Sequence, residues 1–181
     1  MIIAIIPAKG GSNRLPKKNM QLLLGKPMLQ YAIDYAKASK KVSKIYISTD
    51  DVFIFEYAIS NGIEVIKRPS ELGGETPLIN VYRHALDNLK IDNIETVVGV
   101  QPDHPDRNIS LDESLEYFHK QKLDFLASKE KDGTKNGAHN IMSANGLQTN
   151  IFNKSGYIVD DCTNVHYKSD LLKAEKNLEA I

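Results

Sequence analysis

Short apolar runs rich in β-branched residues recur along the chain and alternate with segments whose apolar residues fall at helical spacing. Runs of this length, bounded by polar turns, are typical of buried strands. We expect strands at 2–6, 44–48, 63–66, 96–100 and 123–128. The helical spacing predicts helices at about 28–36, 51–61, 81–89, 111–122 and 169–178, and Asp50 or Asp51 is a good N-cap for the second. Beyond Lys129 the pattern weakens, and Asn, Gly, Ser and Lys dominate as far as Gly156.

This alternation of strands and helices predicts an α/β fold, with a mainly parallel sheet covered by helices on both faces. A length of 181 residues fits one domain, spanning 1–181. In open sheets of this kind, ligands bind beyond the carboxyl ends of the strands. The loops after the first and fourth predicted strands are therefore where a site is expected.

Composition narrows the class of protein. The chain is 41% hydrophobic and carries 23 basic against 23 acidic residues, so we expect no broad nucleic-acid or anionic-membrane surface. A single cysteine, Cys162, excludes an intrachain disulfide and a multi-thiolate metal site. No apolar stretch reaches the ~18 residues of a membrane helix, and no basic leader precedes the first apolar run. A cytoplasmic protein is expected.

The loop after the first strand, 7–19, gathers two adjacent glycines, Gly10 and Gly11, and four cationic side chains. The glycines allow the backbone positive φ and a close approach to a ligand, and their N–H groups can form an anion-binding nest. The cations have the sign that a polyphosphate requires. Their spacing matches neither the P-loop nor the dinucleotide-binding fingerprint. The alternative is a solvated basic loop with a glycine turn.

The order of motifs resembles that of the sugar-acid cytidylyltransferases, which comprise the CMP-sialate (acylneuraminate) synthetases and the related CMP-Kdo synthetases. The matching segments, in chain order, are 6–19, 24–28, 47–51, 68–72, 84–86 and 101–107. The resemblance implies a three-layer α/β/α, Rossmann-like nucleotidyltransferase fold of the GT-A-like type. It also implies a Mg²⁺-dependent enzyme that transfers CMP from CTP to the anomeric hydroxyl of a sialic-acid-like 2-keto sugar acid and releases pyrophosphate.

The resemblance assigns roles to individual residues. Three cations, Lys9, Arg14 and Lys18, would neutralise the triphosphate and act in catalysis. At the first of them the family has an arginine, so the lysine keeps the charge without the bidentate fork. The nucleotide-binding set would comprise Ala8, Lys9, Gly10, Gly11, Lys18, Asn19, Arg68 and Gln101. Glu75 and Thr76 resemble an acidic–threonine step that follows in the family.

The loop after the fourth predicted strand supplies the candidate metal ligand. Asp103 falls on the position where the Kdo branch has a magnesium-holding aspartate, and a carboxylate beside a polyphosphate suits this hard ion. The alternative is that Asp103 and Asp106 cap the helix that starts near Ser110. His104 is interpreted as a turn histidine without a catalytic role.

The C-terminal half, 111–181, departs from the family and is interpreted as a shortened sugar-acceptor half, following a nucleotide-binding half at 1–110. The segment between Ser128 and Asn136 is short where the family carries a dimerisation arm, so a homodimer stays an open alternative. The family's two C-terminal metal aspartates fall near His166 and Lys168. Asp160 or Asp161 would replace them only with a slip in strand register.

Three functions are compatible with these observations. The first is an active cytidylyltransferase with CTP and an acidic sugar as its partners. The second is a catalytically inactive, nucleotide-binding relative with a regulatory or partner-binding role, which the mismatch at the C-terminal metal positions favours. The third keeps the fold but uses a different nucleoside triphosphate as the donor.

Overall fold

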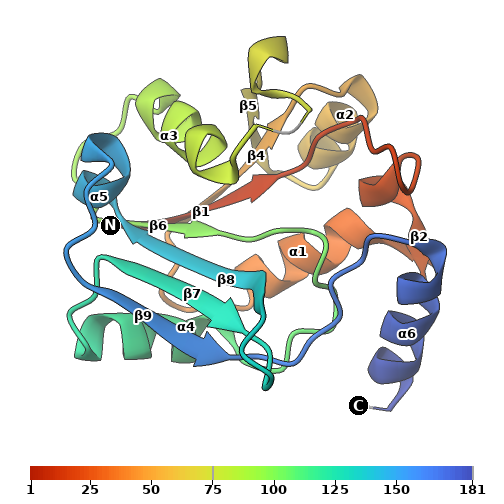
Figure 1. Cartoon of the computed structure of the whole chain (residues 1–181). Helices are drawn as coiled ribbons and strands as arrows, with labels where there is room; N and C mark the ends of the chain where they lie inside the picture. Colours follow the sequence, from red (N-terminus) through yellow and green to blue (C-terminus); the bar gives the residue numbers. More distant parts are fainter. Residues whose placement is uncertain (75, 181) are drawn as a thin grey trace.

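A computed structural model describes residues 1–74 and 76–180, and its centre is a seven-stranded sheet of order β5-β4-β1-β6-β8-β7-β9 (Figure 1). The strands of this sheet are β1 (Ile2–Pro7), β4 (Lys44–Thr49), β5 (Glu64–Lys67), β6 (Thr96–Gly99), β7 (Phe125–Lys129), β8 (Lys135–Ser143) and β9 (Ser155–Val159). A separate two-stranded hairpin consists of β2 (Leu22–Leu23) and β3 (Lys26–Pro27). The five predicted strands are all present, with ends that differ by one or two residues.

The described residues also form six α-helices and two short 3₁₀ helices, η1 (Lys18–Met20) and η2 (Ser70–Leu72). The α-helices are α1 (Met28–Lys37), α2 (Val52–Ser60), α3 (Leu78–Asn88), α4 (Leu111–Lys120), α5 (Ala144–Thr149) and α6 (Lys168–Glu179). Asp51, one of the two predicted caps, accepts hydrogen bonds from the backbone N–H groups of Phe53 and Ile54. None of the described helices has the length and apolar character required to cross a membrane.

Two apolar cores lie on opposite faces of the sheet and make the three layers that the sequence predicts. Helices α1, α2 and α4 contribute to one core, and α3 and α5 contribute to the other (Figure 1). Burial of apolar surface on both faces is the main stabilising contribution, at roughly 25 cal/mol per Å². A third, smaller cluster joins the β2–β3 hairpin to α6 through side chains that include Leu23 and Leu171.

The parallel strands β4, β1 and β6 end at one edge of the sheet, with Ile6 opposite Ile47 and Ile5 opposite Gly99. Because β1 pairs on both sides, its fully buried side chains fix the register of its two neighbours. The loops that follow these strands therefore start side by side. The predicted division of the chain at residue 110 stays a prediction.

The segment after Lys129, where the pattern weakens, forms regular structure. β8 runs antiparallel to both β6 and β7, and β9 pairs in parallel with β7, so the sheet is mixed with four parallel and two antiparallel pairs. The weak pattern has a physical reason, since β8 buries polar side chains such as Asn136 and His139. Their hydrogen bonds are made inside the protein, so a polar composition does not indicate a loop here.

A buried network around Asp160 anchors the chain after β9. The Asp160 carboxylate lies 2.7 Å from Nε2 of His139 and accepts hydrogen bonds from the backbone and side chain of Asn108. Burial alone would raise the pKa of Asp160, but the hydrogen bonds from His139 and Asn108 lower it to about 2. On the other side of the ring, Nδ1 of His139 lies 3.0 Å from Oγ of Ser114. The network therefore connects β8, α4 and the β9–α6 segment.

We predict that Asp160→Ala lowers the free energy of unfolding by about 3 kcal/mol, because it leaves buried donors without an acceptor. Urea denaturation followed by circular dichroism at neutral pH measures this change. The matched control is Asp161→Ala, since the neighbouring Asp161 is 38% exposed and pairs with Lys131 at the surface; its cost should be within about 0.5 kcal/mol. Equal effects of the two substitutions would contradict the assignment.

A second buried histidine, His104, is 1% exposed, and neither ring nitrogen makes a hydrogen bond to the described part of the chain. Burial, assisted by the nearby charge of Arg107, lowers the pKa of His104 well below its usual value. The folded protein therefore holds His104 neutral at a pH where the unfolded chain protonates it. The difference in the pKa of His104 between the folded and unfolded chain therefore stabilises the folded protein above about pH 6.5, and this stabilisation is lost as the pH falls.

We predict that His104→Leu weakens the pH dependence of stability. Between about pH 7.5 and pH 5.5, wild-type protein should lose about 1.4 kcal/mol more than the variant does, because the unfolded chain of the variant lacks that proton site. Urea unfolding at the two pH values gives the difference. The same substitution at the exposed His119 of α4 serves as control and should leave the pH slope unchanged. A slope unaffected by His104→Leu would refute this account.

Candidate nucleotide-binding site

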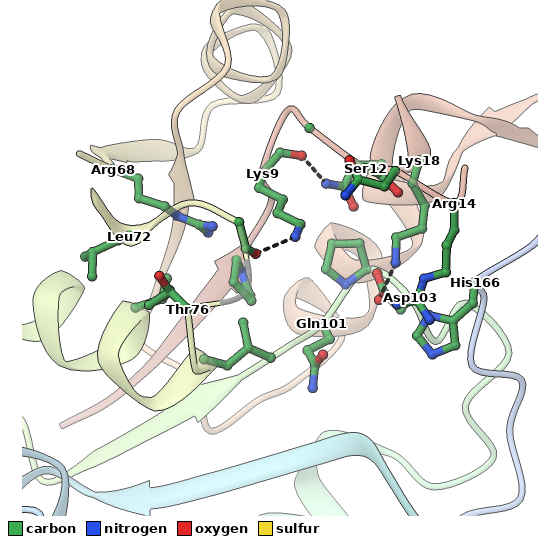
Figure 2. Close-up of a pocket in the computed structure, with 18 residues that line it drawn as sticks. Lys9, Ser12, Arg14, Lys18, Arg68, Leu72, Thr76, Gln101, Asp103 and His166 are labelled. Carbon is green, nitrogen blue, oxygen red and sulfur yellow. Dashed lines mark hydrogen bonds and ion pairs between the residues drawn. The ribbon is translucent and has the colours of Figure 1, made fainter. Parts of the chain in front are cut away.

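A cavity of about 330 Å³ opens at the edge of the sheet where β1 and β6 end (Figure 2). Its walls come from the loop after β1, the η2 segment, α3, the loop after β6 and the segment before α6. The residues that line it are Pro7, Lys9, Gly11, Ser12, Asn13, Arg14, Lys18, Asn19, Arg68, Leu72, Gly74, Thr76, Leu78, Val81, Gln101, Pro102, Asp103 and His166. All the predicted site residues except Ala8 and Gly10 are among them. Their functional roles stay predictions.

The loop after β1 places its cations around this cavity. The Nζ atom of Lys9 donates a hydrogen bond of 2.8 Å to the carbonyl of Gly74 on the opposite wall (Figure 2). Asn19 is buried, and its side chain donates to the carbonyl of Lys9, so the far end of the loop folds back onto its start. A solvated basic loop would not make the contact to Gly74, which is distant in the sequence. The loop is therefore an ordered wall.

The predicted conformation of the two glycines is wrong. Neither Gly10 nor Gly11 has a positive φ. Gly10 is required for another reason, because a Cβ atom there would lie 2.4 Å from the carboxylate of Asp51. Its N–H donates to Asp50, which leaves this group no part in an anion nest. Gly11 has open space around its Cα and does line the cavity.

Ala8 is also absent from the cavity wall. Its side chain is fully buried in the core that α1, α2 and α4 share, and its backbone N–H extends the β1–β4 ladder to the carbonyl of Ser48. A backbone contact from Ala8 to a base is thus limited to its carbonyl. The apolar Ala8 is explained by packing alone.

The contact at the centre of the cavity is an ion pair between Lys18 and Asp103. Their Nζ and Oδ2 atoms are 2.6 Å apart, and the side chains are only 12% and 19% exposed (Figure 2). Lys18 also donates to the carbonyl of Val165, whose N–H in turn donates to the carbonyl of Asp103. Three segments distant in sequence therefore meet at this pair.

Neither aspartate of the loop after β6 caps α4, contrary to the alternative drawn from the sequence. Ser110 is the N-cap, in a capping box with Glu113. The Asp106 carboxylate is buried and accepts hydrogen bonds from the backbone N–H and hydroxyl of Thr163 and from the side chain of Asn177. Asp106 therefore holds the C-terminal segment in place, and Asp103 is left to face the cavity.

Arg68 and Gln101 form the floor on the sheet side. The guanidinium of Arg68 is buried and donates to the carbonyl of Ser48 at the end of β4, and burial lowers its pKa. The Nε2 atom of Gln101 donates to the carbonyl of Gly137 in β8. Because Gly137 has φ of +78° and a Cβ atom there would meet the Gln101 amide at 2.6 Å, only glycine allows this approach.

Arg107 is a positioning residue to which the sequence analysis gives no role, although it ends the motif 101–107. Its buried guanidinium donates to the carbonyls of Gln101, His104 and Ala138 and lies 4.7 Å from the centre of the Tyr35 ring. These bonds fix the whole loop after β6 against β8. The sequence contains one signal for this role: an arginine a few residues after the glycine and proline at the end of a predicted strand.

The residues near the two C-terminal metal positions differ in their location. His166 lines the cavity, and its Nδ1 atom is buried without a hydrogen-bond partner in the described ranges. Lys168 is exposed at the start of α6, outside the cavity wall. Asp160 is committed to His139, and Asp161 pairs with Lys131, so neither replaces a missing ligand. Glu75 lies outside the described residues.

Among the described residues of the cavity wall, Asp103 alone offers a carboxylate to a divalent ion in the cavity. The described residues contain no group of three or more His, Cys, Asp and Glu side chains that could hold a metal. Mg²⁺ often takes one or two carboxylates and completes its coordination with substrate phosphates and water. The donor set thus fits an ion that arrives with a polyphosphate.

Comparisons with known proteins agree with this architecture. The family model described as "Cytidylyltransferase" matches residues 3–176. The chain is 38% identical over 100 residues to 3-deoxy-manno-octulosonate cytidylyltransferase 2 of Hydrogenovibrio crunogenus, covering 55% of this chain and 39% of that protein. It is 31% identical over 161 residues to N-acylneuraminate cytidylyltransferase of Streptococcus agalactiae serotype III, covering 87% of this chain and 36% of that protein.

The chain thus spans less than two fifths of the length of these two relatives. Among solved structures, CMP:2-keto-3-deoxy-manno-octonic acid synthetase complexed with CTP shares the fold, with a TM-score of 0.78 at 14% identity and coverage of 99% of this chain and 98% of that one. The expected nucleotidyltransferase fold is confirmed. Together with the match of the family model over almost the whole chain, these findings show that the chain belongs to the cytidylyltransferase family.

Proposed function

We propose that the protein transfers CMP from CTP to the anomeric hydroxyl of a 2-keto sugar acid, of the sialic acid or Kdo type, with release of pyrophosphate. The observation that carries the proposal is the convergence of Lys9, Arg14 and Lys18 with one carboxylate, Asp103, around a single cavity at the carboxyl edge of the sheet. A cavity of this kind suits a polyphosphate and its counter-ion. Membership of the family supports the choice of CTP.

The chain's own part in this reaction is to position the triphosphate and neutralise its charge. Lys9 and Arg14 both come from the loop after β1, and they lie on either side of the ion pair between Lys18 and Asp103 (Figure 2). A bound triphosphate offers Lys18 a second anionic partner, and the ammonium can exchange Asp103 for phosphate oxygen without a change of environment. Charge-assisted hydrogen bonds of this type contribute about 1.5–3 kcal/mol each.

With Lys18 paired to the phosphates, the Asp103 carboxylate would be free to hold Mg²⁺. The ion, when bound, would polarise the phosphoryl group toward attack. Arg68, Asn19 and Gln101 also line the cavity and would contact the nucleoside. The side chain of Gln101 is held by the carbonyl of Gly137, and its backbone carbonyl is held by Arg107, so its position at the cavity wall is fixed.

We predict that Lys18→Met raises the Kd for CTP at least tenfold, because a buried phosphate loses its ammonium partner; this equals about 1.4 kcal/mol. Asp103→Asn should reduce pyrophosphate release on the order of 100-fold while retaining CTP binding, since it removes the carboxylate proposed to hold the ion. Isothermal titration with CTP and a coupled pyrophosphate assay measure the two effects. Tested acceptors are N-acetylneuraminate and 3-deoxy-manno-octulosonate.

The adjacent Lys17 gives a matched control, because its Nζ lies over the ring of Phe53, 5.8 Å from its centre, and outside the cavity wall. Lys17→Met should leave CTP affinity within about twofold of wild type. Equal losses of CTP affinity in Lys17→Met and Lys18→Met would mean that the cavity cations act only through nonspecific electrostatic attraction. That result would overturn the proposal.

Two alternatives make different forecasts. A relative that binds nucleotide without catalysis would bind CTP and release no pyrophosphate with any sugar acid. The presence of His166 at a family metal position favours this alternative, and in it Lys168→Asp would not restore turnover.

A transferase with another donor would show its largest thermal stabilisation with ATP, GTP or UTP, since specific binding raises the melting temperature by mass action.

A further inference from the structure

The two edges of the seven-stranded sheet differ in their chemistry. β5 forms one edge, and it begins with Glu64 and ends with Lys67, charged side chains of the kind that protect an edge strand from pairing with another chain. β9 forms the other edge, and its five residues include neither a charged residue nor a proline. The edge at β9 therefore lacks the usual protection against an added strand.

The backbone of β9 offers hydrogen-bonding groups along this edge. Just after β9, the N–H of Asp160 donates to the carbonyl of Lys129 in β7. Because successive residues of a strand turn these groups to opposite sides, those of Ser155, Tyr157 and Val159 face away from β7. All three residues are exposed, and no strand in the described part of the chain pairs with β9 on this side.

Two ammonium groups lie beside this edge, over the ring of Tyr157. The Nζ atom of Lys129 is 3.7 Å from the centre of the ring, and that of Lys135 is 5.5 Å from it. These two lysines are direct partners across the antiparallel β7–β8 pair, so their charges repel each other. Within the described ranges, neither ammonium forms an ion pair with a carboxylate, whereas Lys131 in the loop between them pairs with Asp161.

The position of the two charges indicates which side chains of an added strand would meet them. Ile158 packs against the core to which α4 contributes, so the neighbouring Tyr157 points to the opposite face of the sheet, which α4 does not cover (Figure 1). A strand paired with β9 would lie about 4.8 Å from it. Its side chains on the open face would therefore come within reach of the ammonium groups held over Tyr157, and carboxylates there would neutralise both.

A second copy of the chain does not fit this edge. Two β9 strands paired around a two-fold axis would bring Lys129 and Lys135 of both copies together on one face, where four ammonium groups would meet without a carboxylate. A nucleic acid has the required charge, but its backbone cannot extend a β-sheet. An extended polypeptide with acidic side chains supplies both the missing strand and the missing charge.

We infer that the edge of β9 binds an extended acidic segment of another protein, which adds a strand to the sheet and pairs its carboxylates with Lys129 and Lys135. None of the described residues of β7, β8 and β9 lines the nucleotide cavity, so a segment bound at this edge would leave the cavity open. The inference is therefore independent of the proposed reaction.

Three eight-residue peptides provide the test, and each alternates valine with one other residue, which is glutamate, glutamine or lysine. Binding is followed by NMR titration of the ¹⁵N-labelled protein, with the amides of Ser155, Tyr157 and Val159 as reporters. The glutamate peptide should bind about fivefold more tightly than the glutamine peptide, as expected for two partly exposed ion pairs, and the lysine peptide should bind most weakly. In about 1 M NaCl the advantage of glutamate should fall to within about twofold.

Variants separate the contribution of charge from that of the strand edge. Lys129→Met/Lys135→Met should remove the preference for glutamate, and Lys131→Met, at a side chain 82% exposed in the loop between them, should retain it. Val159→Pro should abolish binding, because proline removes an N–H that faces away from β7 and leaves the bonds to β7 in place. Val159→Thr is the matched control and should bind as wild type does. Thermal unfolding checks that each variant is folded.

The inference is overturned if the glutamate peptide does not bind wild-type protein or binds no more tightly than the glutamine peptide. It is also overturned if the preference survives in the lysine double variant, or if binding survives in Val159→Pro. A dimer that appears in analytical ultracentrifugation and is abolished by Val159→Pro would assign the edge to a second copy instead. The comparisons of peptides and of salt use wild-type protein, so they decide the question even where a variant does not fold.

Discussion

The ion pair between Lys18 and Asp103 is the interaction on which the geometry of the site depends. It connects the loop after β1 to the loop after β6, and the bonds of both residues to Val165 attach the segment before α6. Because both side chains are largely buried, removing either one would leave a charge without its partner in a poorly solvated place. The same contact keeps a cation and a carboxylate beside each other, which the proposed function requires for a triphosphate and its ion.

The first half of the chain could be predicted closely from the sequence. Apolar strands buried on both faces leave little freedom of register, so the loops after β1 and β6 had to meet at one edge. The expected position of Lys9, Arg14, Lys18 and Asp103 around one cavity followed from that topology together with the family resemblance. Conformation within the loop did not follow, because the need for Gly10 is created by Asp51, which is distant in the sequence.

The second half was harder to predict because its strands bury hydrogen-bonded polar groups. β8 places Asn136 and His139 inside the protein, where Ser128, Ser114 and Asp160 satisfy them. The pattern of apolar and polar positions predicts a loop for such a strand. The pattern depends only on residue type and contains no information on the hydrogen-bond partners of a buried polar side chain. The proximity of Lys129 and Lys135 was invisible for the same reason, since it depends on the β7–β8 register.

These two halves make different demands on the same edge of the sheet. In the proposed function a triphosphate is recognised by charge, which the loop after β1 would supply from a rigid wall that folding itself builds. Arg107 and Gly137 hold Gln101 at the border between this wall and the antiparallel strand β8, through the backbone carbonyl and the side chain of Gln101 respectively. The parallel half of the sheet therefore supplies the charged loops of the cavity, and the antiparallel half fixes the position of one of its walls.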